Sequence, residues 1–445
     1  MAHLPMPRTL TVQCFVNGVW QDAFTLTFQD PLNPGDTRCT SGYLTDYVVS
    51  HIDELNSPFE QSVSVCQRLG LNVGYSRGYP AFIHDVMPAG AAFRSLKKRF
   101  AASKPDDIGL ELYLLERCTP SPVGHLRIKE SLGYLREGRV MGFDRREVVQ
   151  RNSEFLEYAY EQGAAIGGAT GAGGEAPKLL LVEAEDGRLY ADAVLDDAQV
   201  RQHWFVKFAR NRAAPRDKDI LRSEFHYYQA ITALGMETIS TQGMALEDDG
   251  EHNPSLWMPR FDRRITEHGI QRHAVESIYS ICGNTEPGSF MRHEDVLHRL
   301  LTLWCEAGQT DQLFDLRVDY IARDLLNRVL GNSDNHGRNT AILRDGGRLR
   351  LAPIYDLAPM VLDPEGVTRV TKWDHEERGA PDWRAACRSH ADSVTGDEVF
   401  EALRGIAAKF RALPDLLTGL PDEVRRARTL PLNDLDARLK EWGLL

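Results

Sequence analysis

The sequence predicts an α+β fold with a small β-rich N-terminal subdomain and two lobes, a mixed α/β lobe and a mostly helical C-terminal lobe. Short segments of alternating hydrophobicity, separated by turn residues, fill the N-terminal part. Strand patterns and a helix pattern follow a glycine-rich segment in the middle, and helical periodicity dominates the remainder. Such changes in element type indicate separate structural units. We predict that these units cover residues 1–105, 106–260 and 261–445.

The composition is that of an ordinary globular protein of two or three domains. The chain has 445 residues, of which 42% are hydrophobic and 26% are charged. It lacks an apolar run of the roughly 18 residues that a membrane-spanning helix needs, and its N-terminus does not resemble a signal peptide. We therefore expect a cytoplasmic protein without a membrane segment. The net charge of −12 disfavours broad nucleic-acid binding, which needs clustered cations.

The seven cysteines lie far apart in the sequence, without a CxxC pair, and their number is odd. This spacing argues against a disulfide framework and against a zinc site. We expect buried thiols, because free cysteine is among the residues most often buried.

The predicted elements follow from local patterns. Residues 9–16 and 19–28 alternate around a hairpin turn at Asn17-Gly18, and residues 91–101 have helical spacing. Residues 145–162 suggest one helix, and residues 179–183 and 189–191 flank a turn at Asp186-Gly187. Helical spacing returns in residues 311–330, 397–413 and 432–442, and residues 340–343 and 349–351 form a further hairpin.

Three polar residues near the end of the 311–330 helix indicate a phosphoryl-transfer site. Asp334 and Asn339 lie in one loop, and Asp356 follows the next hairpin, which returns it to that loop. Phosphoryl transfer needs a carboxylate at the attacking hydroxyl and hard oxygen ligands for Mg²⁺. A kinase is therefore the leading hypothesis, with Asp334 at the hydroxyl and with Asn339 and Asp356 as metal ligands.

The same loop is rich in Asn, Ser, Asp and Gly, so in isolation a simple turn is the favoured interpretation. The order of helix, Asp-x₄-Asn, hairpin and Asp favours the site over the turn. For His336 we expect a hydrogen bond that shapes the loop, because Mg²⁺ prefers oxygen ligands.

An apolar strand over residues 203–208 carries Lys207, and a helix over residues 220–233 carries Glu224. A buried ammonium needs an anion. A phosphate would supply one and Glu224 would orient the lysine, as in the small lobe of kinases. The alternative is a lysine on the exposed face of the strand.

The glycine-rich segment is a candidate phosphate-binding loop, although it is not a Walker motif. Its Gly171, Gly173 and Gly174 precede Lys178 and the strands, and backbone N–H groups of such loops can wrap phosphates. A flexible linker is the alternative. Between the lobes, Pro259 and Phe261 are candidates for a hinge that contacts adenine, with Phe261 as the donor because proline has no N–H. A core position for Phe261 is an equal alternative.

Taken together, these motifs resemble the HipA family of bacterial toxin serine/threonine kinases. The resemblance rests on Gly331–Asn339, Ala352–Leu357, Arg260–Arg263, Phe205–Phe208, Ser223–Tyr227 and Glu175–Lys178. It implies a bilobal protein-kinase-like fold in which residues 106–260 form the ATP-binding lobe and residues 261–445 the catalytic lobe.

The resemblance also implies roles and partners. Asp334 would be the catalytic base, Asn339 and Asp356 the Mg²⁺ ligands, Lys207 the catalytic, phosphate-binding lysine and Phe261 the hinge contact, with ATP and Mg²⁺ as cofactors. The family's autophosphorylated loop serine aligns with Gly171, next to Thr170. Members pair with a small helix-turn-helix, HipB-like antitoxin that supplies the DNA contact, and known targets include aminoacyl-tRNA synthetases.

Two other functions fit the same residues. A small-molecule kinase would use them on a sugar or antibiotic hydroxyl. A catalytically silent scaffold for an antitoxin or DNA would keep only the fold. The presence of Lys207, Asp334, Asn339 and Asp356 favours an active protein kinase.

Overall fold

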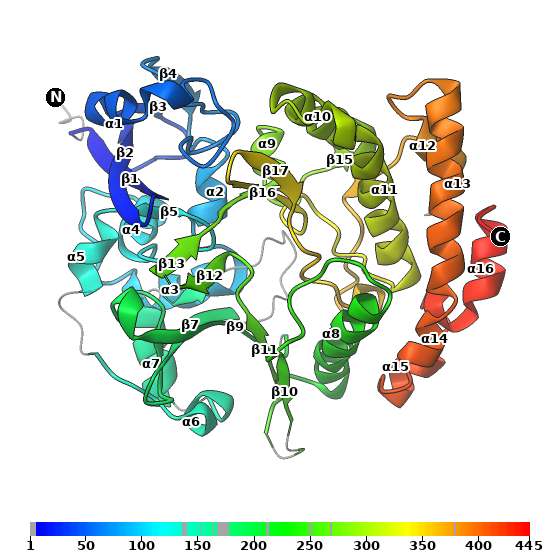
Figure 1. Ribbon diagram of the computed structural model, residues 1–445. Coiled ribbons are helices and arrows are strands. Elements are labelled where there is room, and N and C mark those ends of the chain that lie inside the picture. Colours follow the sequence, from blue (N-terminus) through cyan, green and yellow to red (C-terminus); the bar gives the residue numbers. More distant parts are fainter. Residues whose placement is uncertain are drawn as a thin grey trace.

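The computed structural model describes residues 6–135, 140–151, 153–162, 164–166, 178–210, 213–248, 250, 252–267, 269–377 and 380–445. Its N-terminal part is built on an antiparallel sheet with the strand order β4-β3-β2-β1-β5 (Figure 1). The strands are β1 (Arg8–Val16), β2 (Val19–Phe28), β3 (Arg38–Tyr43), β4 (Gly74–Arg77) and β5 (Leu126–Ile128). Positive φ angles at Asn17 and Gly18 (53° and 78°) close the predicted β1–β2 turn.

Short helices pack around this sheet. They are α1 (Thr45–Ser50), the 3₁₀ turn η1 (Ile52–Glu54), α2 (Ile83–Val86), α3 (Gly90–Phe100), α4 (Leu110–Arg117) and α5 (Ser131–Leu135). The sheet's buried side chains join those of the helices in one hydrophobic cluster, which continues into the second sheet. The first two predicted units therefore share a core.

The second sheet has the order β10-β11-β9-β7-β6, with β8 paired to β7. Its strands are β6 (Ala165–Ile166), β7 (Lys178–Ala184), β8 (Leu189–Ala191), β9 (Val200–Phe208), β10 (Ala245–Glu247) and β11 (Ser255–Pro259). The associated helical segments are α6 (Arg145–Val149), α7 (Ser153–Glu161), η2 (Asp197–Gln199) and α8 (Pro215–Ala233). Helix α8 packs against β11 and begins at a proline, and the following Gly235 takes a positive φ of 77°.

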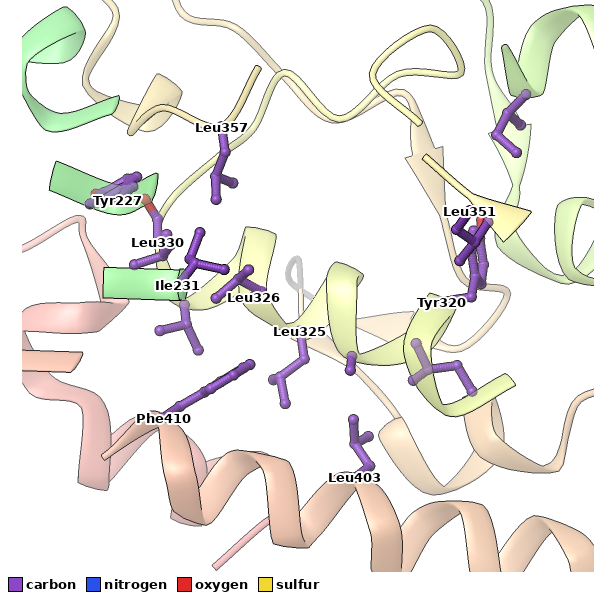
Figure 2. Close-up of a cluster of buried hydrophobic side chains, with 14 of the residues drawn as sticks. Tyr227, Ile231, Tyr320, Leu325, Leu326, Leu330, Leu351, Leu357, Leu403 and Phe410 are labelled. Carbon is purple, nitrogen blue, oxygen red and sulfur yellow. Dashed lines mark hydrogen bonds between the residues drawn. The ribbon is translucent and has the colours of Figure 1, made fainter. Parts of the chain in front are cut away.

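The C-terminal part is mostly helical and lies opposite the N-terminal sheet in Figure 1. Its helices are α9 (Ile278–Ile281), α10 (His293–Glu306), η3 (Thr310–Gln312), α11 (Leu313–Val329), η4 (Met360–Leu362), α12 (Trp383–Arg388), α13 (Ser393–Phe410), α14 (Leu413–Leu416), α15 (Asp422–Arg426), η5 (Pro431–Asp434) and α16 (Leu435–Glu441). Figure 2 shows how Ile231 of α8, Leu325 and Leu326 of α11, and Leu403 and Phe410 of α13 meet in its core. This packing fixes the end of α11, where the Asp334 loop begins.

Small sheets complete the fold: β12 (Arg263–Thr266) with β13 (Gly269–Arg272), β14 (Ala274–Ser277) with β16 (Ala341–Asp345) and β17 (Arg348–Leu351), β15 (Met291–Arg292) with β18 (Thr371–Lys372), and β19 (Glu376–Glu377) with β20 (Ala380–Pro381). The β16–β17 hairpin and helix α11 confirm two sequence predictions around the site.

A buried ion pair joins the N-terminal part to the β14–β16 sheet. Arg344 is fully buried and pairs with Glu276 at 3.1 Å. Its Nη1 donates to the carbonyl oxygens of Phe59 and Ser62, both at 2.9 Å. Glu276 accepts from the N–H of Val65. The N-terminal part is therefore fastened to the strands beside the Asp334 loop.

The structure differs from the sequence predictions at several places. The helix predicted over residues 145–162 is wrong as a single element, because Arg151 takes a positive φ (52°) that no α-helix contains and α6 and α7 are separate. All seven cysteines are free, but Cys66 and Cys305 are exposed rather than buried. Strand β5 lies beyond residue 105 yet belongs to the first sheet; the three domain limits remain predictions.

A mixed fold of sheets and helices agrees with the predicted fold class. Among the described residues, no helix is both long and apolar enough to cross a bilayer.

Candidate active site

Lys207 and Glu224 form a buried ion pair between β9 and α8. The Lys207 Nζ lies 2.5 Å from Glu224 Oε2, and the two side chains are 8% and 1% exposed. The Tyr228 hydroxyl donates to the other Glu224 oxygen at 3.0 Å. Burial raises the pKa of Glu224. Burial would lower the pKa of Lys207, but the charges of Asp356 and Glu224 outweigh it and raise that pKa. The exposed-lysine alternative is thus wrong.

A second lysine lies directly opposite the first. Lys178 of β7 pairs in register with Lys207 of β9, and two like charges so placed repel each other. Asp356 relieves this repulsion: its Oδ2 lies 2.8 Å from Lys178 Nζ and its Oδ1 2.6 Å from Lys207 Nζ. Although burial acts in the opposite direction, the two ammonium groups hold the pKa of Asp356 well below its usual range.

The backbone at Asp356 is unusual. Its φ is +55°, in the left-handed region that residues other than glycine rarely adopt. Asn332 bridges this residue to the preceding helix, since its Nδ2 donates to Asp356 O at 3.4 Å and to Asn327 Oδ1 at 2.9 Å. A strained conformation held from several sides is common at functional sites.

The loop that carries Asp334 and Asn339 is held by internal hydrogen bonds. Asn332 Oδ1 accepts from the N–H of Asp334 at 3.2 Å, and Asn339 Nδ2 donates to Asp334 O at 2.6 Å. As predicted, His336 helps to shape the loop, because its Nδ1 accepts from the N–H of Arg338. At Gly337 an added Cβ would lie 2.4 Å from Tyr279 Cδ1, so this position has no room for a side chain.

Asp334 is a carboxylate with a shifted acidity. Burial and the neighbouring charge of Asp356 raise its pKa to about 6, against the opposing effect of Arg210. Arg210 Nη1 lies 3.7 Å from Asp334 Oδ2, and His336 Nε2 lies 3.7 Å from Asp334 Oδ1. At neutral pH most of this carboxyl group is ionised and able to accept a proton.

Two supporting groups were missed by sequence reasoning. Arg210 follows β9 and is itself held by Asp363, with Nε and Oδ2 3.0 Å apart. Asp324 lies behind the loop, where it accepts from Asn335 Nδ2 at 3.0 Å and from Trp373 Nε1 at 2.9 Å. Arg210 lies more than a hundred positions from Asp334 and Asp363, and the place of Asp324 behind the loop depends on how the chain turns after α11, so spacing contained no signal for either residue.

A cavity between the sheets opens onto these groups. It is lined by Asp85, Val123, Lys178, Phe205, Lys207, Glu224, Tyr228, Ile239, Met258, Pro259, Arg260, Phe261, Asp262, Val275, Ser277, Arg338, Asn339, Ala341, Tyr355 and Asp356. The wall is mainly apolar and its charged groups converge, which is typical of ligand sites. The ring of Phe261 stacks on Tyr355, with centroids 5.4 Å apart and planes at 19°.

The segment predicted to form a hinge is anchored by a second buried network that sequence reasoning also missed. Arg260 pairs with Asp192 and Asp262, and Arg263 pairs with Asp262. The N–H of Arg260 donates to His203 O at 3.0 Å, so this donor is used within the fold. Pro259 and Phe261 are thereby held at the edge of the cavity.

The structure gathers most of the predicted site residues at one place. Around the cavity lie Lys178, Lys207, Glu224, Pro259, Phe261, Asn339 and Asp356, and Asp334 is joined to them through Asn339. Gly171, Gly173, Gly174 and Thr170 lie outside the described residues. The roles of all these residues remain predictions.

Comparison with known proteins identifies related folds. The family model described as the HipA-like C-terminal domain matches residues 170–413. The curated proteins include no match by sequence. A solved structure of HipA from Shewanella oneidensis MR-1, in complex with HipB and its operator DNA, has a TM-score of 0.62 and 16% identity, and the match covers 98% of this chain and 96% of that one. This likeness shows the fold.

The Helicobacter pylori proinflammatory kinase CtkA has a TM-score of 0.30 and 13% identity, with 53% of this chain and 92% of that chain covered.

Proposed function

The chain belongs to the family defined by the HipA-like C-terminal domain, whose model spans more than half of its length, and we propose that it is an ATP- and Mg²⁺-dependent serine/threonine protein kinase of the HipA toxin type. Its fold is then bilobal and kinase-like, with the nucleotide between the second sheet and the helical part.

The observation that carries this proposal is the cluster of Lys207, Glu224 and Asp356. One buried ammonium touches a helix carboxylate and the carboxylate that follows the β16–β17 hairpin. Kinases need this lysine–glutamate pair to place phosphates and this aspartate to hold a metal. A lysine buried between two carboxylates in this way is suited to binding the phosphates of a nucleotide.

The residues present fit Mg²⁺ and a nucleotide. Asn339 and Asp356 offer an amide and a carboxylate oxygen, the hard ligands that Mg²⁺ prefers. The described residues include no cluster of three or more His, Cys, Asp or Glu for a metal, which agrees with an ion that nucleotide phosphates help to hold. When bound, Mg²⁺ would neutralise charge on the transferred phosphoryl group.

Lys178 and Lys207 would face the phosphates, and Pro259 and Phe261 would lie against adenine. Asp334 would accept the proton of a serine or threonine hydroxyl while the hydroxyl oxygen bonds to the γ-phosphorus and the bond to ADP breaks.

We further propose a small helix-turn-helix, HipB-like antitoxin as partner. The solved HipA of similar fold is in complex with HipB and operator DNA. The net charge of −12 suits a protein that meets DNA through a partner rather than directly.

The test is phosphate transfer from γ-labelled ATP with Mg²⁺ to proteins of a bacterial lysate. Wild type should label protein bands, aminoacyl-tRNA synthetases being the first to identify by mass spectrometry, and Asp334→Asn should label at least about 100-fold less. The matched control is Asp311→Asn, an exposed carboxylate in η3. Equal labelling by wild type and Asp334→Asn would refute the proposal. Label found only in small molecules would favour a small-molecule kinase.

A further inference from the structure

One carboxylate in the cavity comes from the N-terminal part and has no place in the phosphoryl-transfer scheme. Asp85 belongs to α2, yet it lines the same cavity as Lys207 and Asp356. Its side chain is 19% exposed. Burying a charged group costs free energy unless the group is paired or hydrogen-bonded.

The contacts of Asp85 leave acceptor capacity on both oxygens. Ser277 donates to it twice, from its hydroxyl to Oδ1 at 2.7 Å and from its N–H to Oδ2 at 2.9 Å. Arg338 Nε is 3.9 Å from Oδ1, beyond hydrogen-bonding distance. An ionised carboxylate can accept about four hydrogen bonds, so two sites remain for a ligand.

The other three carboxylates of the cavity are more fully used. Glu224 and Asp356 contact lysines at 2.8 Å or less. Asp262 binds Arg260, Arg263 and the N–H of Gly124. Within the described chain, Asp85 is therefore the cavity carboxylate best able to accept from a bound molecule.

The position of Asp85 identifies the part of the ligand that it meets. Arg338, its neighbour, directly precedes Asn339, and the Tyr355 hydroxyl donates to Arg338 O at 2.6 Å. The ring of Tyr355 stacks on Phe261 of the hinge segment. Asp85 thus lies beside the loop proposed for the metal and lines the same cavity as the segment proposed for adenine. In a nucleotide, the group between the base and the phosphates is the sugar.

We propose that Asp85 binds the ribose hydroxyls of the nucleotide, so that the N-terminal part completes the nucleotide site and selects ribonucleotides. This inference rests on the proposed function. A negative charge repels phosphates but accepts hydrogen bonds from a vicinal diol, and a site built around a ligand hydroxyl discriminates against the analogue that lacks it.

The experiment measures binding, by calorimetry, of ATP, 2′-deoxy-ATP and 3′-deoxy-ATP in the presence of Mg²⁺. Wild type should bind ATP about tenfold or more tightly than at least one deoxy analogue, the size expected for a hydrogen bond to a charged group. Asp85→Ala should lose affinity for ATP and bind all three alike. Asp85→Asn, which can still accept from Ser277, serves if the alanine variant does not fold and should reduce the discrimination. Asp46→Asn, an exposed residue of the same part, should behave as wild type.

The outcomes separate the two ideas. If wild type binds the three nucleotides equally, or if both Asp85 variants weaken all three by the same factor, Asp85 has only a structural role and the inference is wrong. If wild type binds none of them, the proposed function fails together with the inference.

Discussion

Replacing Lys207 with methionine tests the arrangement on which the site depends. Methionine keeps an unbranched side chain only one atom shorter and removes the charge. Asp356 would still have Lys178 at 2.8 Å, but Glu224, 1% exposed, would lose the cation at 2.5 Å. Removing one member of a buried ion pair costs about 3–5 kcal/mol. We expect that decrease in the free energy of unfolding, together with loss of nucleotide binding.

A double-mutant cycle separates charge from packing. Glu224→Gln alone should cost about 1–3 kcal/mol, because Lys207 keeps Asp356 at 2.6 Å. Lys207→Met with Glu224→Gln leaves no unpaired charge at this position. Its cost should be smaller than the sum of the single changes by at least about 1 kcal/mol.

The assay is urea denaturation followed by fluorescence, with Lys98→Met as an exposed control that should change stability by less than about 0.5 kcal/mol. The raised pKa of Lys207 means that its stabilising effect is complete below the ordinary pKa of lysine, about 10.4, and is lost only above it. The charge of Lys207 in the wild type is therefore constant from pH 6 to pH 9, whereas in the variant the Glu224 carboxyl group, without its cation, has a still higher pKa and the penalty grows as the pH rises. A cost of Lys207→Met below about 1 kcal/mol, or strict additivity in the cycle, would refute the reasoning.

Two further predictions concern the loop and Asp85. Gly337→Ala should lower the free energy of unfolding by about 1–3 kcal/mol and reduce phosphate transfer, because its Cβ would lie 2.4 Å from Tyr279. The control Gly405→Ala, with open space around it, should do neither. Equal effects of the two substitutions in calorimetry and kinase assays would contradict this prediction. Burial raises the pKa of Asp85 from 3.8 to about 6. The folded state therefore favours the protonated form, and the free energy of unfolding should fall by about 2–4 kcal/mol as the pH rises from about 4 to above 6. Asp85→Asn cannot titrate and should escape this loss, so a stability difference from wild type that stays constant between pH 4 and pH 7 would show that Asp85 is not buried as described.

Much of the fold followed from local patterns. Helix α11, the β16–β17 hairpin and the β1–β2 turn were predicted because periodicity and turn residues act over a few neighbouring residues. The division of residues 145–162 into two helices was not, since it depends on the single backbone angle at Arg151. The exposure of Cys66 was also missed, because residue type gives only the average burial of a thiol.

The sequence by itself determined the chemistry that is available. An Asp-x₄-Asn loop, a returning Asp and a lysine strand ahead of a glutamate helix limit the candidate reactions strongly, because phosphoryl transfer uses a carboxylate at the hydroxyl, oxygen ligands for Mg²⁺ and a lysine at the phosphates. Only the tertiary structure decided how they are charged and supported. It placed Lys178 opposite Lys207, set Arg210 beside Asp334, and brought Asp85 from the N-terminal part into the cavity. The contacts of Arg210 and Asp85 join residues more than a hundred positions apart, and the energy of each contact depends on burial and distance, which spacing in a sequence does not contain.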